Sequence, residues 1–219
     1  MTSSVRSRAR LVGARRIDGG NMAKSEVVAG HRPGPRRPPG SPSGPDEVRR
    51  AVLDAAAQLF AERGVGQVSL RDVATAANTH LGLIGRYIGD REELELAAFD
   101  DLSAQLARSV SENPLSGQGH GVETVMGKWS RVTASLVMRG RPLAGREGFN
   151  PVAAMANTIV DGYGLDPVAA RVRAAQIVAM AIGWRVFEDY LVEAGELDEV
   201  PLAALREELV YTARRLGAT

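Results

Sequence analysis

The chain has 219 residues, of which 44% are hydrophobic, so it can bury a core as one moderate domain or two small ones. It has no cysteine, which excludes disulfides, thiolate nucleophiles and metal sites with cysteine ligands. The longest strongly apolar run, residues 174–184, is shorter than the roughly 18 to 20 residues of a membrane span, and no apolar signal segment follows the N-terminal arginines. We therefore expect a cytoplasmic protein without a membrane partner.

The net charge of +1 conceals a basic N-terminus. Residues 1–45 carry nine Arg or Lys against Asp18 and Glu26, so the rest of the chain is net acidic. The stretch HRPGPRRPPGSPSGP at 31–45 is rich in Pro, Gly and Ser and has no apolar periodicity, which predicts a disordered basic arm over residues 1–45. Such an arm either adds phosphate contacts that ignore base sequence or is a solvated tail. Met22 is an alternative start, so residues 1–21 need not be native.

Helical signals dominate from residue 46 onward. Residues 46–63 have acids in the first turn and apolar residues at helical spacing, and they stop before a glycine. Ser69 with Asp72, and Asp90 with Glu93, form two capping-box patterns that each predict the start of a helix. The core residues predicted for these three helices are Val52, Ala56, Leu59, Phe60, Val73, Ala74, Ala77, Leu94, Ala98, Leu102 and Leu106.

A short helix, a tight turn near Asn78 and a second short helix at about 80–88 match the plan of a helix-turn-helix. Asparagine tolerates the left-handed backbone that such a turn requires. In the second short helix, Ile84 and Ile88 lie four residues apart and are expected to face the core. The side chains expected to face outward are His80, Leu83, Arg86 and Tyr87.

Two glycines, Gly82 and Gly85, lie inside that second helix, where each costs about 1 kcal/mol relative to alanine. A helix backbone that must approach a phosphate strand closely gives a reason for both. The alternative is that the glycines only permit tight packing against the helix at 46–63.

Residues 53–99, LDAAAQLFAERGVGQVSLRDVATAANTHLGLIGRYIGDREELELAAF, resemble the DNA-binding domain of the tetracycline-repressor (TetR) family of bacterial regulators. The shared features are the apolar first helix ending in ERG, Ser69, RDVA at 71–74, Ala77, Gly82, Tyr87 and DREEL at 90–94. The resemblance implies an all-α fold with a three-helix DNA-binding domain at 46–92. A larger helical ligand-binding and dimerisation domain would then span 93–219.

The resemblance also implies DNA contacts, although this chain departs from the family pattern. It has Leu81 where the family usually has a lysine, Gly85 where a tyrosine is common, and Ile88 where an aromatic residue often follows Tyr87. By position, Tyr87 corresponds to a phosphate contact, and Leu83 and Arg86 correspond to base contacts, for which leucine suits a thymine methyl and arginine suits guanine. The DNA-binding residues predicted in this way are Ser69, Thr79, His80, Leu81, Gly82, Leu83, Arg86 and Tyr87.

Beyond a Pro- and Gly-rich linker at 113–121, the pattern predicts helices near 121–138, 151–162, 166–194 and 199–216, and a short one near 142–148. The helix at 166–194 has two apolar faces, one of them running from Ile177 through Met180, Trp184 and Phe187 to Leu191. In the TetR family the last two long helices pair with their copies in a second subunit, so we expect a homodimer. The expected interface residues are Ala175, Ala179, Ile182, Val186, Leu202, Leu205 and Leu209. Alternatively, both helices only close the core of their own subunit.

A pocket for an apolar small-molecule effector is expected from the large or flexible apolar residues of this domain, unless they are plain core. These residues are Met126, Trp129, Phe149, Met155, Ile159, Tyr163 and Trp184. Arg139, Arg141 and Arg146 follow the helix at 121–138 and either meet an acidic group of the ligand or form a solvated loop.

No catalytic constellation is visible, because the three histidines fall in the tail, the second short helix and the linker, away from acidic pairs at metal-binding spacing. We expect no enzyme, no cofactor and no metal. The working hypothesis is a ligand-responsive transcriptional regulator, a repressor, that binds a palindromic DNA operator as a dimer. The alternative is a helical interaction or scaffold protein that does not bind DNA.

Overall fold

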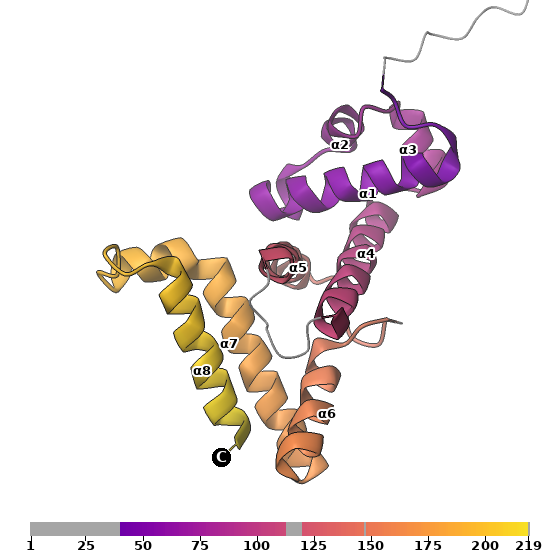
Figure 1. Ribbon diagram of the computed structural model, residues 1–219. Coiled ribbons are helices and arrows are strands. Elements are labelled where there is room, and N and C mark those ends of the chain that lie inside the picture. Colours follow the sequence, from indigo (N-terminus) through magenta and orange to yellow (C-terminus); the bar gives the residue numbers. More distant parts are fainter. Residues whose placement is uncertain (1–39, 113–119, 147, 219) are drawn as a thin grey trace, which may run out of the picture. The chain divides into compact units, whose positions relative to one another are not determined.

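The computed structural model describes residues 40–112, 120–146 and 148–218, and this part of the chain is all-α (Figure 1). The elements are α1 (Gly44–Arg63), a 3-10 turn η1 (Val65–Gln67), α2 (Leu70–Ala76), α3 (Leu81–Tyr87), α4 (Arg91–Glu112), α5 (His120–Met138), α6 (Pro151–Tyr163), α7 (Pro167–Ala194) and α8 (Leu202–Ala218). The predicted fold class is confirmed. The basic arm lies outside the described residues as far as position 39, and so does the linker segment 113–119.

Helix α1 begins two residues before its predicted start. Gly44 and Pro45 open the first turn, where a proline needs no hydrogen-bond donor, and Asp46 and Glu47 place negative charge at the positive end of the helix. The carboxylate of Glu47 also accepts a 2.8 Å hydrogen bond from the backbone nitrogen of Ser43. The helix ends at Gly64, whose φ of 81° suits glycine.

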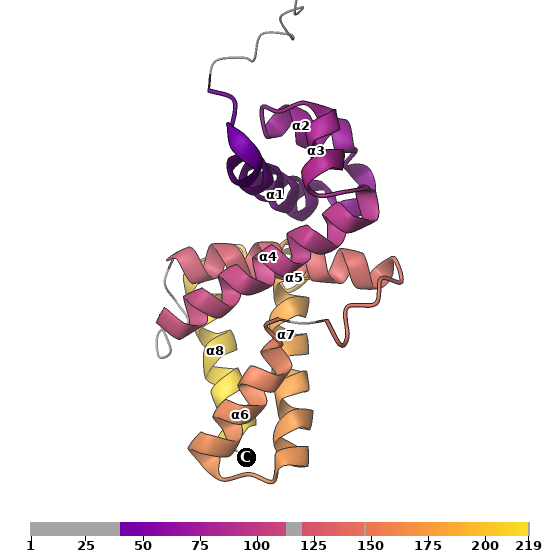
Figure 2. The ribbon, with the colours of Figure 1, turned by 90° about the vertical axis from the view of Figure 1, so that its right-hand side faces the viewer.

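One large buried cluster joins α1, η1, α2 and α3 to α4 and α5. It contains all eleven core residues predicted for the first helices, among them Phe60 and Leu106. Trp129 and Leu136 of α5 complete the cluster from the other side. Figure 2 shows α4 running from the three N-terminal helices past α5, and α4 packs against both α1 and α5. The two predicted domains therefore share one core at this junction.

A second, much smaller cluster lies between α6 and α7 and consists of Ala156, Ile159, Ala170, Ala174 and Ile177. Each of these helices has a side-chain cap, because Asn150 and Asp166 accept hydrogen bonds from the first backbone nitrogens of α6 and α7. Helix α8 packs along α7, where the carboxylate of Glu188 receives two hydrogen bonds from Arg206, at 2.8 and 3.1 Å. Burial alone would raise the pKa of Glu188, but the hydrogen bonds and charge of Arg206 outweigh it and lower the pKa.

Two predicted helix positions are wrong. The short helix near 142–148 is absent from the described part of that segment, which forms an irregular loop with a turn at 144–145. Gly145 and Gly148 have φ values of 79° and 123°, which a right-handed helix excludes. The last helix starts at Leu202 rather than 199, because Pro201 disfavours helical geometry in the residue before it and residues 198–200 form a turn instead.

Candidate nucleic-acid interface

The start of α2 confirms the first predicted capping box. The hydroxyl oxygen of Ser69 accepts a 3.2 Å hydrogen bond from the backbone nitrogen of Asp72, whose carboxylate accepts a 2.8 Å bond from the backbone nitrogen of Ser69. The hydroxyl of Ser69 also donates to this carboxylate at 2.6 Å, and these bonds from Ser69 hold the pKa of Asp72 below its usual value. The side chain of Ser69, a predicted DNA contact, is therefore engaged in the cap but remains exposed.

The turn between α2 and α3 has the predicted left-handed residue, since φ of Asn78 is 48°. Backbone hydrogen bonds from Asn78 to Thr75 and from Thr79 to Ala74 close the turn at 3.1 and 2.9 Å. A second capping box lies at the start of α4. The backbone nitrogen of Asp90 donates to the carboxylate of Glu93 at 2.7 Å, and the backbone nitrogen of Glu93 donates to the carboxylate of Asp90 at 2.9 Å. Helix α3 is thus held between two well-defined ends.

Only part of α3 faces outward as predicted. Ile84 is fully buried. The accessible face of α3 consists of His80, Leu81, Gly82, Gly85 and Arg86, and Leu81 is 42% exposed. Thr79 is half-buried next to this face.

The prediction that Leu83 and Tyr87 face outward needs correction, because both are half-buried and pack against the large cluster together with Ile88. A helix of seven residues with two glycines has few apolar side chains, so its core contact uses nearly all of them.

The glycines of α3 do not serve tight packing. A Cβ atom added at Gly82 or Gly85 would meet no atom from elsewhere in the described chain within 4 Å. The packing alternative is therefore wrong. The two glycines leave a strip of bare backbone on the accessible face of α3, beside the guanidinium of Arg86, which lies 5.4 Å from the centre of the Tyr87 ring.

Sequence reasoning missed Arg49 of α1. Its Nη1 donates a 3.2 Å hydrogen bond to the backbone oxygen of Tyr87, the last residue of α3. A cation at this end compensates one of the free carbonyls and the negative end of the helix dipole. Arg49 therefore positions α3 relative to α1, and no local pattern signals it because the partners lie 38 residues apart.

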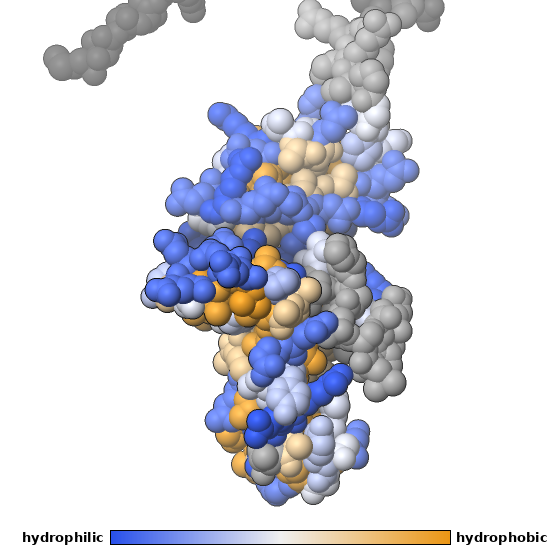
Figure 3. Space-filling model, turned by 60° about the vertical axis from the view of Figure 1, so that its left-hand side comes forward, coloured by the Kyte–Doolittle hydropathy of each residue, from blue (hydrophilic) through white to orange (hydrophobic). Residues whose placement is uncertain are grey.

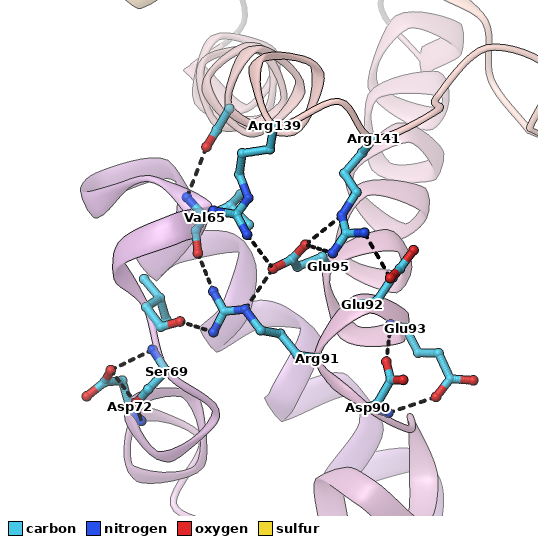
Figure 4. A network of polar contacts seen from close by, with 12 residues as sticks. Val65, Ser69, Asp72, Asp90, Arg91, Glu92, Glu93, Glu95, Arg139 and Arg141 are labelled. Atoms are coloured by element: carbon cyan, nitrogen blue, oxygen red, sulfur yellow. Dashed lines mark hydrogen bonds and ion pairs between the residues drawn. The ribbon is translucent and has the colours of Figure 1, made fainter.

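Another unpredicted feature is a buried carboxylate at the junction between the N-terminal helices and the rest of the chain (Figure 4). Glu95 of α4 has no exposed surface, and its oxygens lie 2.9 Å from Nε of Arg91 and 3.1 Å from Nη2 of Arg141. Arg139 lies further away, at 3.9 Å. We call Glu95 and these three arginines the Glu95 cluster.

The Glu95 cluster ties three separate segments together. Arg91 also donates to the carbonyl oxygens of Val65, the first residue of η1, and Val68, the residue after it, at 2.6 and 2.5 Å. The backbone nitrogen of Val65 donates to the hydroxyl of Ser135 on α5 at 3.1 Å. The start of α4, the connection between α1 and α2, and the end of α5 are thus linked by charge-assisted hydrogen bonds.

Arg139, Arg141 and Arg146 pair with acidic residues of α4. Arg139 and Arg146 remain exposed, as a solvated loop would have them, and Arg141 is half-buried. Arg146 forms two hydrogen bonds to Asp100, at 2.9 and 2.5 Å, which raise the pKa of the arginine. Arg141 additionally pairs with Glu92 at 2.8 Å. Charge complementarity with a helix 46 residues upstream decided their role.

The seven predicted pocket residues lie in different places. Trp129 belongs to the large cluster, where its indole donates to Ser103 at 3.0 Å, and the half-buried Met126 and Phe149 pack against that cluster. Ile159 belongs to the small cluster between α6 and α7, and the half-buried Met155 packs against it. Tyr163 is 49% exposed, and Trp184 donates to Glu188 at 3.1 Å. None of the seven lines the open groove of about 520 Å³ between α1, α5 and α8, which contains Glu62, Lys128 and Arg206.

The predicted dimer face of α7 is largely uncovered. Ala175 and Ala179 are exposed, and the same side of the helix carries Val168, Val172 and Tyr190, which are 59%, 55% and 67% exposed. Val186 is half-buried on this side, whereas the half-buried Ile182 packs against the large cluster. On α8, Leu202 is exposed and Leu205 and Leu209 are half-buried. Figure 3 shows apolar surface among hydrophilic residues over the lower part of the chain, which includes α7 and α8.

None of the helices in residues 40–112, 120–146 and 148–218 is long and apolar enough to cross a membrane. The same ranges hold no group of three or more His, Cys, Asp or Glu side chains arranged to bind a metal ion.

Comparison with known proteins identifies the family. The family described as bacterial regulatory proteins, tetR family, matches residues 52–98. The HTH-type transcriptional repressor Rv3405c of Mycobacterium tuberculosis is 34% identical over 167 residues, which cover 75% of this chain and 86% of the relative. The HTH-type transcriptional repressor AcnR of Corynebacterium efficiens is 35% identical over 71 residues, 32% of this chain and 38% of the relative.

Among solved structures, the fatty acid degradation regulator FadR of Bacillus halodurans has a TM-score of 0.48 and 15% identity, covering 80% of this chain and 95% of that one. The family assignment depends on the sequence relatives and on the helix-turn-helix itself. The chain belongs to the tetR family of bacterial regulatory proteins and is a transcriptional regulator.

Proposed function

We infer that this regulator binds an operator DNA through α3 and represses transcription. The observation that carries the inference is the accessible face of α3, where bare backbone at Gly82 and Gly85 lies beside Arg86. A backbone without side chains can approach a phosphate strand closely, while arginine can form two hydrogen bonds to guanine in the major groove. The name of the 34% identical relative, a transcriptional repressor, supports repression.

Operator binding in this proposal requires two copies of the chain. The uncovered side of α7 forms an apolar stripe that includes Val168, Val172 and Tyr190, and monomeric proteins rarely expose large apolar patches. A second copy of the same stripe is its natural partner, because isologous contacts of this kind produce closed dimers. Two α3 helices would then enter successive major grooves of a palindromic site.

Control by a small molecule is the third part of the proposal. An effector can release DNA only if it binds one arrangement of the subunits better than the other. The Glu95 cluster supports a route for such a change, because it connects the end of α5 and the loop after it to η1, between α1 and α2. An effector that moves this loop would thereby act on the helices that hold α3.

The alternative is a helical scaffold protein, for which α3 would be only structural. The two functions differ in DNA binding: a regulator binds its operator more tightly at low salt than at high salt, whereas a scaffold shows no such binding. Duplexes from the intergenic region beside the gene are the first probe, because an inverted repeat there would be a candidate operator.

The decisive measurement compares variants of α3 on that operator and on its single-base variants, at one salt concentration. Arg86→Ala should abolish the preference at one base pair in each half-site, worth about 1 to 3 kcal/mol. Tyr87→Phe removes a hydroxyl but keeps the ring that packs against the core, so it should weaken binding to every duplex equally, by about 1 kcal/mol.

Arg63→Ala, at the other end of α1 from Arg49, is the matched control and should change neither property. If Arg86→Ala weakens all duplexes by the same factor, Arg86 contacts phosphate and base reading belongs to other residues of α3.

A further inference from the structure

The accessible face of α3 has an apolar edge. Leu81, the first residue of the helix, is 42% exposed. Among residues 40–109, whose side chains the structure describes, it is the one Val, Leu, Ile, Met or aromatic side chain that is exposed rather than buried or half-buried. All the others in this region pack at least partly into the protein, so Leu81 is the exception there.

The helical period places Leu81 and Arg86 at the two edges of the accessible face. With about 100° between successive residues, Gly85 lies about 40° from Leu81 around the helix axis, and Gly82 lies about 40° from Arg86. The two glycines therefore form the middle of the face. A Cβ atom added at either of them would meet no atom from elsewhere in the described chain within 4 Å. The face thus consists of bare backbone with an apolar side chain at one edge and a cation at the other.

This arrangement suits contact with an apolar group in the major groove of DNA. The first residues of a recognition helix are the ones that contact base edges there. The side chain of Leu81 cannot form hydrogen bonds, but it matches the 5-methyl group of thymine, which lies in the major groove. Leucine is shorter than arginine and reaches a base only if the helix backbone comes close, and Gly82 and Gly85 leave the backbone free to do so.

We propose that Leu81 contacts a thymine methyl group in each half-site of the operator and thereby selects thymine at that position. The contact that the sequence suggested for Leu83 then belongs to Leu81, because Leu83 packs against the large cluster. Arg86 lies about 7.5 Å further along α3, at about 1.5 Å per residue, so its guanine and the selected thymine should be about two or three base pairs apart. This inference rests on the proposed operator binding by α3.

The first test replaces the thymines of the operator by uracil, one position at a time in both half-sites. Uracil lacks only the methyl group. At one position the replacement should weaken binding of the full chain by about fourfold for each methyl group, or roughly 15-fold for the two half-sites together. Replacement of the other thymines should have a smaller effect.

Variants of Leu81 assign that loss to its side chain. Leu81→Ala should bind the thymine and uracil duplexes equally at this position, whereas Leu81→Met, which keeps a long apolar side chain, should retain most of the difference. Both should keep the helical content of the parent by circular dichroism, because the position is exposed and both residues are good helix formers. Val137→Ala, at an exposed position of α5, is the control and should respond to uracil as the full chain does. A loss that persists unchanged in Leu81→Ala would overturn the proposal.

The second test adds a methyl group to the middle of the face. Gly85→Ala should reduce the difference between the thymine and uracil duplexes, because the new side chain holds the backbone away from the groove floor. The fold should not suffer, since alanine favours a helix and the position has open space. Gly162→Ala, at an open glycine of α6, is the matched control and should leave the difference unchanged. A full thymine preference in Gly85→Ala would contradict the close approach that the proposal requires.

The inference and the proposed function fail in different ways. If the full chain binds no DNA sequence selectively, the proposed function itself fails. If it binds an operator but no replacement of thymine by uracil weakens binding, only the assignment of Leu81 fails.

Discussion

The N-terminal helices and the α6–α8 region use their apolar residues in opposite ways. In α1, α2 and α3, large apolar side chains such as Phe60 and Ile84 are at most 2% exposed and belong to one cluster that continues into α4 and α5. In α7 and α8, Phe187, Tyr190 and Tyr211 are all more than half exposed, and the local cluster is small. The first region completes its core within one chain, whereas the second leaves large apolar side chains exposed, as the proposed dimer would require.

The largest expected effect is loss of the dimer. Ala179→Glu places a charge in the middle of the apolar stripe of α7, and burying it without a partner costs several kcal/mol. We expect the dimer dissociation constant to rise by at least about 100-fold, since each 1.4 kcal/mol is tenfold. Sedimentation equilibrium measures it, with Gln176→Glu, an exposed polar position on the same helix, as the control. An Ala179→Glu protein that remains dimeric would show that the two regions do not differ in this way.

The next prediction tests both regions with the same substitution. In the Ala179→Glu background, Phe60→Ala should lower the free energy of unfolding by about 3 to 5 kcal/mol, because it leaves a cavity in the large cluster. Phe187→Ala should change it by no more than about 0.5 kcal/mol, because that ring is 56% exposed. Urea unfolding followed by circular dichroism gives both values. Similar losses would mean that Phe187 is part of a core in the single chain.

A third prediction concerns the junction. Glu95→Gln removes the buried charge that Arg91 and Arg141 share, but these arginines are partly exposed, so water compensates part of the loss. We expect the free energy of unfolding to fall by about 1 to 3 kcal/mol. Glu92→Gln removes an exposed partner of Arg141 and should cost less than about 1 kcal/mol. Equal values for the two variants would show that the Glu95 cluster does not stabilise the junction.

The smallest effect is the pH dependence of the contact between α7 and α8. Because the folded-state pKa of Glu188 lies below its unfolded value, its pair with Arg206 stabilises the fold at pH values above the unfolded pKa. The stabilisation is lost as the pH falls through the folded-state pKa. Glu188→Gln should therefore be less stable than the parent by about 1 kcal/mol at pH 7, and the difference should shrink toward zero as the pH falls through the folded-state pKa of Glu188.

Unfolding curves at a series of pH values measure that difference for Glu188→Gln. Glu193→Gln, an exposed carboxylate later on α7, is the control. A difference for Glu188→Gln that persists at low pH would assign the loss to packing rather than to the charge.

The sequence by itself determined the features whose partners lie within a few residues. The two capping boxes, the left-handed Asn78 and the apolar stripes of α1 and α4 follow from interactions within one or two helical turns, and the structure has them where they were predicted. The family was also readable, because its motifs lie in one continuous stretch at 53–99.

Only the tertiary structure decided which helix surfaces meet. Arg49 and the carbonyl of Tyr87 are 38 residues apart, and Arg141 and Glu95 are 46 apart, so no local pattern pairs them. The predicted pocket residues are apolar and fit either a cavity or a core, and the packing of α5, α6 and α7 placed five of them in or against two separate clusters. Composition gives a side chain its chemistry, but the partner of a long-range contact depends on how helices cross, which many weak packing energies determine together.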